Sequence, residues 1–100
     1  MNSLGVKDLS SRFQNAYQFN KDIGGWDVSN VTNMSEMFDH ALIFNRDITL
    51  WNVSSVTSMY SMFHDTNQFN QNIGRWNVSR VQDMYSVSYT HLTLPTKRIV

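Results

Sequence analysis

Two pairs of side chains in this sequence could support acid–base or metal chemistry, and the members of each pair occupy equivalent positions of successive repeats. Asp39 and His64 form one pair, and His40 and Asp65 form the other. Imidazole changes its charge near neutral pH, and imidazole and carboxylate both bind zinc. A catalytic zinc ion needs three protein ligands and a water molecule, and no third ligand recurs near either pair. We therefore expect surface loops at these positions, with no catalytic residue, no metal and no cofactor.

The two members of each pair are one repeat apart, because the sequence repeats with a fixed period along the chain. Complete copies occupy residues 6–30, 31–55 and 56–80, and a partial copy occupies residues 81–86. A fixed period in the range of about 20 to 50 residues is typical of stacked repeats. Residues one period apart then lie in neighbouring coils, which could bring each His–Asp pair together.

One segment of each repeat has the spacing of a helix. The apolar residues in the second copy are three, four and three positions apart, at Val31, Met34, Phe38 and Ala41. This spacing places them on one face of a helix over about residues 31–41.

A second segment alternates large apolar and polar residues. Trp51 and Val53 flank Asn52, and the other copies repeat this order. Alternation of aromatic and β-branched residues predicts a short strand with Trp and Val inward and Asn outward. Parallel pairing of successive strands would stack the tryptophans into a ladder. The predicted fold class is therefore an α/β solenoid of about three coils, each with one short strand and one short helix, joined by a parallel sheet.

Asparagine recurs where the predicted helix turns into the predicted strand, at Asn20, Asn45 and Asn70. Asparagine side chains satisfy backbone groups in turns. We expect an internal ladder of amides there rather than a binding site.

The repeat ends abruptly after Ser86. Residues 87–96, VSYTHLTLPT, resemble the in-frame translation of a sequencing adapter. We therefore assign residues 1–86 to a fragment of a longer repeat array and interpret residues 87–100 as an artefactual or non-repeat tail. The alternative is a genuine C-terminal cap, since the caps of repeat arrays diverge from the repeat.

The composition excludes several classes of protein. Eight basic and eight acidic residues give a net charge of zero, so bulk electrostatics give no support for a nucleic-acid partner. The chain has no cysteine and no apolar run approaching the ~20 residues of a membrane span. No phosphate-binding glycine loop and no nucleophile motif occur. We therefore do not expect an enzyme.

The repeat signature is V-x-x-M-x-x-M-F-x-x-A-x-x-F-N-x-x-I-x-x-W-[DN]-V-S, and it extends from Val6 to about Ser86. It resembles the BspA-like leucine-rich-repeat surface proteins. The resemblance implies a leucine-rich-repeat-like stack, located on the cell surface or secreted, that takes part in adhesion or protein binding rather than catalysis. Arg12 departs from the signature where later copies have Met37 and Met62, which suggests an edge coil whose core face is partly open.

The predicted function is a non-catalytic repeat module of a cell-surface protein that binds a protein or a glycan. Solenoids bind partners through the face built by their strands, because outward side chains recur there at the spacing of the coils. The predicted binding residues are Asp27, Asn52, Asn77, Leu50 and Arg75. The alternatives are a structural spacer without a specific ligand and a small intracellular protein-interaction solenoid.

Overall fold

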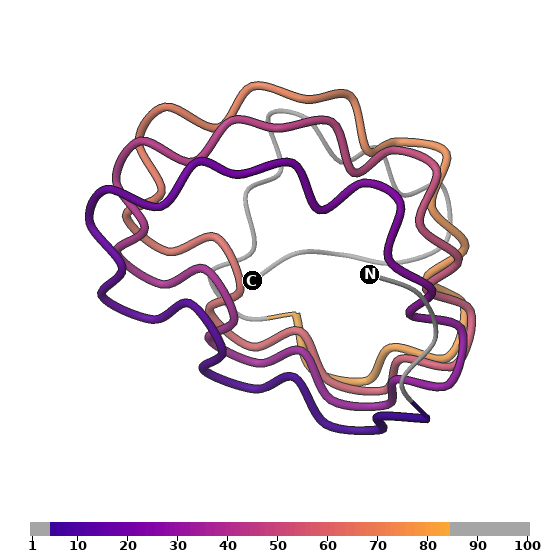
Figure 1. The fold of residues 1–100 in the computed structure, drawn as a ribbon. Helices are drawn as coiled ribbons and strands as arrows, with labels where there is room; N and C mark the ends of the chain where they lie inside the picture. The colour runs from indigo at the N-terminus through magenta and orange to yellow at the C-terminus, as the bar shows by residue number, and fades with distance from the viewer. Residues whose placement is uncertain (1–4, 85–100) are drawn as a thin grey trace.

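The chain winds into stacked coils that follow one another in register (Figure 1). This arrangement comes from a computed structural model, which describes residues 5–84. Parallel backbone bridges join Asp8 to Asn33, Asn33 to Ser58, and Ser58 to Asp83. Each bridge links equivalent positions of successive repeats, so equivalent residues of neighbouring coils lie side by side.

The predicted α/β solenoid is wrong. Residues 5–84 contain no helix and no strand longer than an isolated bridge. Residues 35–40 form turns where the helix was predicted, and Trp51 and Val53 lie outside any strand, at the ends of the turns 48–51 and 53–56. The leucine-rich-repeat-like sheet of strands backed by helices is therefore also absent from this part of the chain.

The apolar spacing that suggested a helix marks the ends of tight turns. In each of these turns a backbone N–H donates to the carbonyl three residues earlier, at 2.9 to 3.2 Å in the second coil. The residues at the ends of these turns are all buried. A turn and a helix both place residues i and i+3 on the same side, so this spacing fits either structure. The turns with two buried ends span residues 28–31, 34–37, 38–41, 41–44, 48–51 and 53–56, and a further turn, 36–39, begins at the partly exposed Glu36 and closes at 3.3 Å.

Positive φ angles distinguish these turns from a helix. Glu36 (φ 57°) and His40 (φ 63°) are the third residues of the turns 34–37 and 38–41. A positive φ at this place is the mark of a type II turn, and it stops the chain from continuing into a helix. A left-handed residue other than glycine costs roughly 1–2 kcal/mol. The equivalent residues of the neighbouring coils also have positive φ: Ser11, Asn15, Ser61 and Asp65.

Backbone hydrogen bonds between coils offset that cost. Alternate N–H groups of the second coil, from Met34 to His40, donate to alternate carbonyls of the third coil, from Ser58 to His64, at 2.7 to 3.0 Å. The first coil donates to the second in the same way from residues 9–15, at 2.8 to 3.0 Å. Buried backbone donors need a partner, and here that partner is the next coil rather than the preceding turn of a helix.

Aromatic columns fill the space inside the coils. Phe38 stacks between Phe13 and Phe63, with ring centroids 5.7 and 5.6 Å away. Trp51 and Trp76 stack with centroids 6.4 Å apart and planes inclined by 8°. The predicted tryptophan ladder is confirmed for this pair, although no strands build it.

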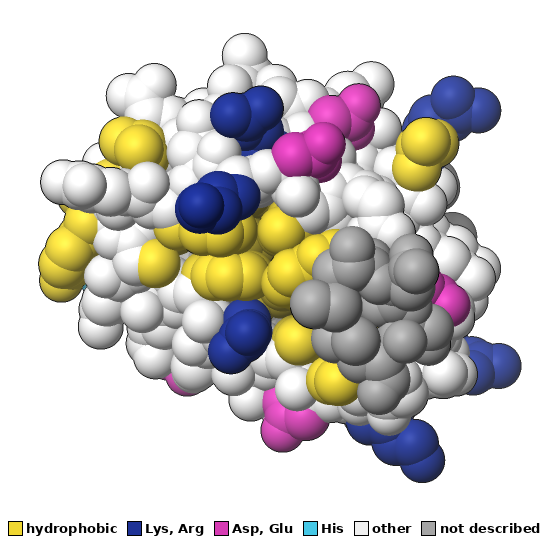
Figure 2. All heavy atoms as spheres, in the orientation of Figure 1, with side chains coloured by type: hydrophobic (Ala, Val, Ile, Leu, Met, Phe, Trp, Pro, Cys, Tyr) yellow, Lys and Arg dark blue, Asp and Glu magenta, His cyan; other side chains and the backbone are white. Residues whose placement is uncertain are grey.

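The first coil exposes part of this core. Val6, Phe13, Phe19 and Trp26 are only partly buried, whereas the equivalent Phe38 has no exposed surface. Figure 2 shows hydrophobic side chains gathered in the middle of this face. The Arg12 guanidinium lies 5.8 Å from the centroid of the Phe13 ring. The partly open core face that Arg12 suggested is observed on the first described coil.

Replacement of Trp51 by Ala should lower the free energy of unfolding by about 3–5 kcal/mol, because it removes a buried ring and leaves a cavity. The indole also donates from Nε1 to the carbonyl of Ile23 at 3.0 Å. Urea denaturation would measure the loss. Leu50→Ala is the matched control, because the neighbouring Leu50 side chain is 91% exposed and its loss should change stability by less than about 0.5 kcal/mol. Equal effects of the two variants would contradict the described core.

Replacement of Glu36 by Val should destabilise the fold by about 1–2 kcal/mol, since a β-branched residue tolerates a positive φ poorly. Glu36→Gly should be neutral or stabilising, because glycine adopts this conformation without steric cost. Thermal unfolding of the two variants would compare them. If the Val variant were the more stable of the two, the type II turn at residues 34–37 would be incorrect.

Candidate functional site

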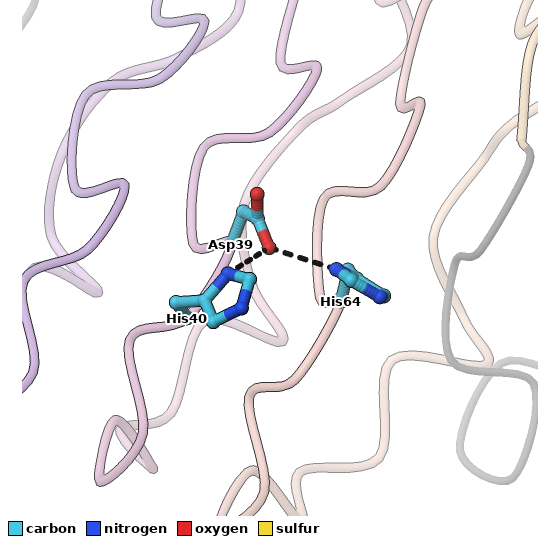
Figure 3. Close-up of side chains that lie close together, drawn as sticks. All are labelled: Asp39, His40 and His64. Atoms are coloured by element: carbon cyan, nitrogen blue, oxygen red, sulfur yellow. Dashed lines mark hydrogen bonds and ion pairs between the residues drawn. The ribbon is translucent and has the colours of Figure 1, made fainter.

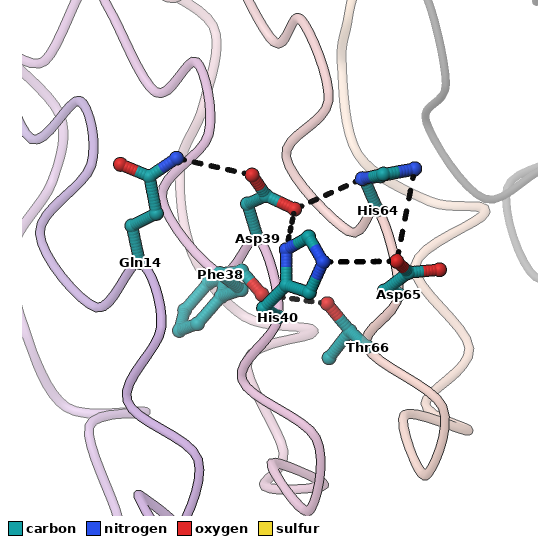
Figure 4. Close-up of polar contacts among 7 residues, drawn as sticks. All are labelled: Gln14, Phe38, Asp39, His40, His64, Asp65 and Thr66. Atoms are coloured by element: carbon teal, nitrogen blue, oxygen red, sulfur yellow. Dashed lines mark hydrogen bonds and ion pairs between the residues drawn. The ribbon is translucent and has the colours of Figure 1, made fainter.

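The main polar cluster comes from the central residues of one turn, repeated in successive coils (Figure 4). In the second coil the turn 38–41 carries Asp39 and His40 at its centre. In the third coil the equivalent turn, 63–66, carries His64 and Asp65. The ends of these turns are buried. Among the central residues Asp39 is also buried, whereas His40, His64 and Asp65 reach solvent, and the register of the stack brings the two pairs together.

Two carboxylates and two imidazoles meet in this cluster. Asp39 Oδ1 lies 2.7 Å from His40 Nδ1 and 3.0 Å from His64 Nδ1 (Figure 3). Asp65 Oδ2 lies 3.0 Å from His40 Nε2 and 3.9 Å from His64 Nε2. The two imidazole rings meet edge to face, with centroids 5.4 Å apart. Each carboxylate therefore lies between both rings.

The contacts between Asp39 and His64 and between His40 and Asp65 confirm what their separation by one repeat suggested. The contact between Asp39 and His40 was missed. This contact joins adjacent residues within a turn. The apolar spacing predicted a helix here, so the positive φ of His40 was not expected. In a helix, adjacent residues do not face each other, so only knowledge of the turn would have united the two pairs.

Asp39 is the most buried member of the cluster and makes the most contacts. Its side chain is 10% exposed, and Gln14 Nε2 from the first coil donates to its Oδ2 at 3.0 Å. Burial alone would raise the pKa of Asp39. Hydrogen bonds from Gln14 and His64, with the charge of His40, outweigh burial and hold that pKa below its usual value. Asp39 is therefore a carboxylate at neutral pH.

His40 carries a buried nitrogen without an aligned hydrogen bond in the described part of the chain. The Nδ1 atom is buried and has no hydrogen-bond partner there, although Asp39 Oδ1 approaches to 2.7 Å as an ion pair. One ligand atom each from Asp39, His40 and His64 lies within 4.8 Å of the others. These three residues could hold a metal ion between the second and third coils.

The predicted binding residues lie in other turns of each coil. Asp27, Asn52 and Asn77 are all exposed. Oδ1 of each side chain accepts the backbone N–H of the serine two residues later, at 3.0 to 3.1 Å. These residues therefore shape turns, and the strand face on which they were predicted to lie does not exist.

Leu50 and Arg75 are the third residues of the turns 48–51 and 73–76. The Leu50 side chain is 91% exposed, and Arg75 is exposed as well. Together with Gly25 of the first coil they form a second outward row beside that of Asp27, Asn52 and Asn77. The outward orientation of the predicted residues is confirmed, and their role in binding stays a prediction.

The asparagine ladder is confirmed, although its members do not lie inside the coils. The backbone N–H of Asn45 donates to Asn20 Oδ1 at 2.9 Å, and that of Asn70 donates to Asn45 Oδ1 at 2.8 Å. Asn45 and Asn70 are exposed. These side chains hold the turns of adjacent coils together.

The sequence profile of a family described as "Mycoplasma protein of unknown function, DUF285" matches residues 1–96. The chain belongs to the DUF285 family. Membership in this family supports the prediction of a repeat module from a surface protein. The DUF285 match includes residues 87–96, which lie outside the described residues, so the adapter origin of the tail stays a prediction.

No curated protein and no solved structure matches this DUF285 chain. Within residues 5–84, no helix has the length and apolar character needed to cross a membrane.

Replacement of Asp39 by Ala should destabilise the fold by about 1–3 kcal/mol, because it leaves buried polar atoms of the cluster without a partner. Asp65→Ala should cost less than about 1 kcal/mol, since the Asp65 side chain is 52% exposed and exposed ion pairs contribute little. Chemical denaturation of both variants at pH 7 would test this order. A larger loss for Asp65→Ala would show that Asp39 is not the centre of the cluster.

Proposed function

We propose that this DUF285 chain is a non-catalytic repeat module of a cell-surface protein and binds a protein or a glycan. The observation that supports this proposal is the pair of exposed rows along the stack. One row consists of Gly25, Leu50 and Arg75, and the other of Asp27, Asn52 and Asn77. The indole N–H groups of Trp51 and Trp76 tie these turns to the preceding coil, which reduces the entropy lost when a partner binds.

The first row offers an apolar anchor beside a charge. Leu50 projects from its turn with 91% of its surface exposed, and the core is complete without it. Gly25 leaves open space on one side of Leu50, since nothing lies within 4 Å of the position that a Cβ atom would occupy there. Arg75 on the other side could bind a carboxylate through paired hydrogen bonds.

The two asparagines of the second row offer hydrogen-bond donors. In Asn52 and Asn77 the turn uses Oδ1 as an acceptor, and the Nδ2 group is not part of that bond. Equivalent residues of neighbouring coils lie side by side, because the bridges between coils keep the repeats in register. Carbonyl and hydroxyl groups of an extended peptide or a glycan could accept from such a row.

The location proposed for the full-length protein is the cell surface, or the medium after secretion. Family membership is the support for this location. The partner is then a macromolecule outside the cell, and no feature of the described residues favours a nucleic acid.

A structural spacer without a ligand is the second candidate. It is favoured by the backbone hydrogen bonds that join successive coils, because these bonds would give the array its length and stiffness whatever the outward residues are. The residue type also changes along one row, from Gly25 to Leu50 to Arg75. Such a change is expected if the three coils do not bind one ligand together.

Binding of the full chain to an immobilised panel of glycans and extracellular-matrix proteins would separate the two candidates. For a panel member that binds, Leu50→Asp should weaken the affinity by about tenfold or more, equivalent to at least about 1.4 kcal/mol. Ile43→Asp is the matched control, because Ile43 is an exposed aliphatic residue (43%) in another turn, and it should not change the affinity. Unchanged circular dichroism must accompany both variants. Equal binding by the wild type and both variants would show that the row of Leu50 is not the binding surface, and no binding to any member of the panel would favour the spacer.

A further inference from the structure

The geometry points to a binding site for a divalent transition-metal ion, with zinc as the preferred ion, formed by Asp39, His40 and His64. The site lies between the second and third coils, in different turns from the rows proposed to bind a partner. It therefore adds a function that does not depend on macromolecular binding.

The donor atoms fit zinc by number and type. His40 and His64 each direct Nδ1 toward the same oxygen of Asp39, and one ligand atom from each of the three residues lies within 4.8 Å of the others. Zinc commonly takes imidazole nitrogens and carboxylate oxygens from three residues, with water as a fourth ligand. Calcium would need six to eight oxygen ligands, so a site with two nitrogens and one carboxylate disfavours it.

Binding of an ion requires the side chains to rearrange. Ligands in a tetrahedral zinc site with bonds of about 2.0–2.1 Å lie roughly 3.3 Å from one another. The two Asp39–His distances, 2.7 and 3.0 Å, would have to open by roughly 0.3–0.6 Å, and any pair of ligand atoms near the 4.8 Å limit of the cluster would have to close. The side chains of His40 and His64 are 39% and 47% exposed, so both rings have room to adjust and the ion can enter from solvent.

Residues behind the three ligands supply the support that metal sites usually have. Asp65 Oδ2 lies 3.0 Å from His40 Nε2, which would fix the ring with Nδ1 free to coordinate. Gln14 Nε2 donates to Asp39 Oδ2 at 3.0 Å and orients the carboxylate. Metal-binding histidines generally donate their other ring nitrogen to a carboxylate, and ligating carboxylates are themselves hydrogen-bonded.

The buried nitrogen of His40 has only a poorly aligned contact with Asp39, at 2.7 Å, which coordination of an ion would replace. This Nδ1 atom has no hydrogen-bond partner in the described part of the chain. Buried polar atoms are nearly always satisfied, and an exception calls for a specific cause such as an ion. Coordination would satisfy this nitrogen and would relieve its unaligned 2.7 Å approach to Asp39.

Titration of the untagged, chelator-treated full chain with Zn²⁺ in a calorimeter tests the proposal. We expect saturable binding of one ion per chain. Co²⁺ should give the intense visible bands of a four-coordinate ion, and Zn²⁺ should displace it. Because the ligands come from two coils and the unfolded chain lacks the site, Zn²⁺ should also raise the melting temperature, and excess chelator should reverse the rise.

Variants of the ligands decide whether this site is responsible. His40→Gln and His64→Gln should each weaken Zn²⁺ binding by at least about 100-fold and abolish the Co²⁺ bands. Asp65→Asn should weaken binding by about 10- to 100-fold, the usual effect of removing a supporting carboxylate. This last variant guards against loss of folding, because Asp65 is 52% exposed.

Two control variants should bind Zn²⁺ like the wild type. His91→Gln removes the third histidine of the sequence, which is not among the three proposed ligands, and Asp47→Asn removes an exposed carboxylate elsewhere on the coils. Binding that is weak and not saturable, or that survives His40→Gln, or that is lost in His91→Gln, would overturn the proposal. None of these outcomes bears on the exposed rows, so the two proposals fail or stand separately.

Discussion

The structure depends on backbone hydrogen bonds that pass from each coil to the next. Alternate N–H groups from Met34 to His40 donate to the following coil at 2.7 to 3.0 Å, and no helix within residues 5–84 competes for them. These bonds hold turns that contain left-handed residues, which would be unfavourable in an isolated chain. They also fix the register, so every column of side chains, whether aromatic, asparagine or His–Asp, follows from this one constraint.

Much of the architecture could be predicted from the repeat. Its fixed period led to the stacking, to the inward Trp51 and Val53, and to an open face at Arg12. The secondary structure was wrong, because residues three and four positions apart share one side of a helix and also mark the ends of consecutive turns. Polar residues such as Glu36 occupy the positive-φ positions, where a glycine would have signalled a turn. The spacing of residues within one repeat could not reveal that alternate backbone N–H groups of residues 34–40 donate to the next coil rather than within their own.

The candidate sites divide in the same way. Contacts that follow the register, such as Asp39 with His64, could be predicted, whereas the contact of Asp39 with His40 depends on turn geometry. The outward rows were predicted on a strand face, and the same side chains project from turns instead, where Oδ1 of Asn52 already serves the backbone. In the cluster, residues 39 and 64 form one column and residues 40 and 65 form the next. The two columns contact each other because adjacent positions of the turn face each other.

The stacking of neighbours also determines how such a chain should fold. The described contacts that hold the stack together join adjacent coils, as in the pairing of Trp51 with Trp76, so their sequence separation stays near one period however many coils are present. Each added coil therefore costs about the same loop-closure entropy as the one before it. Folding can start at one pair of coils and propagate outward, and adding coils lengthens the stack without adding contacts of longer range, which are the contacts that slow folding.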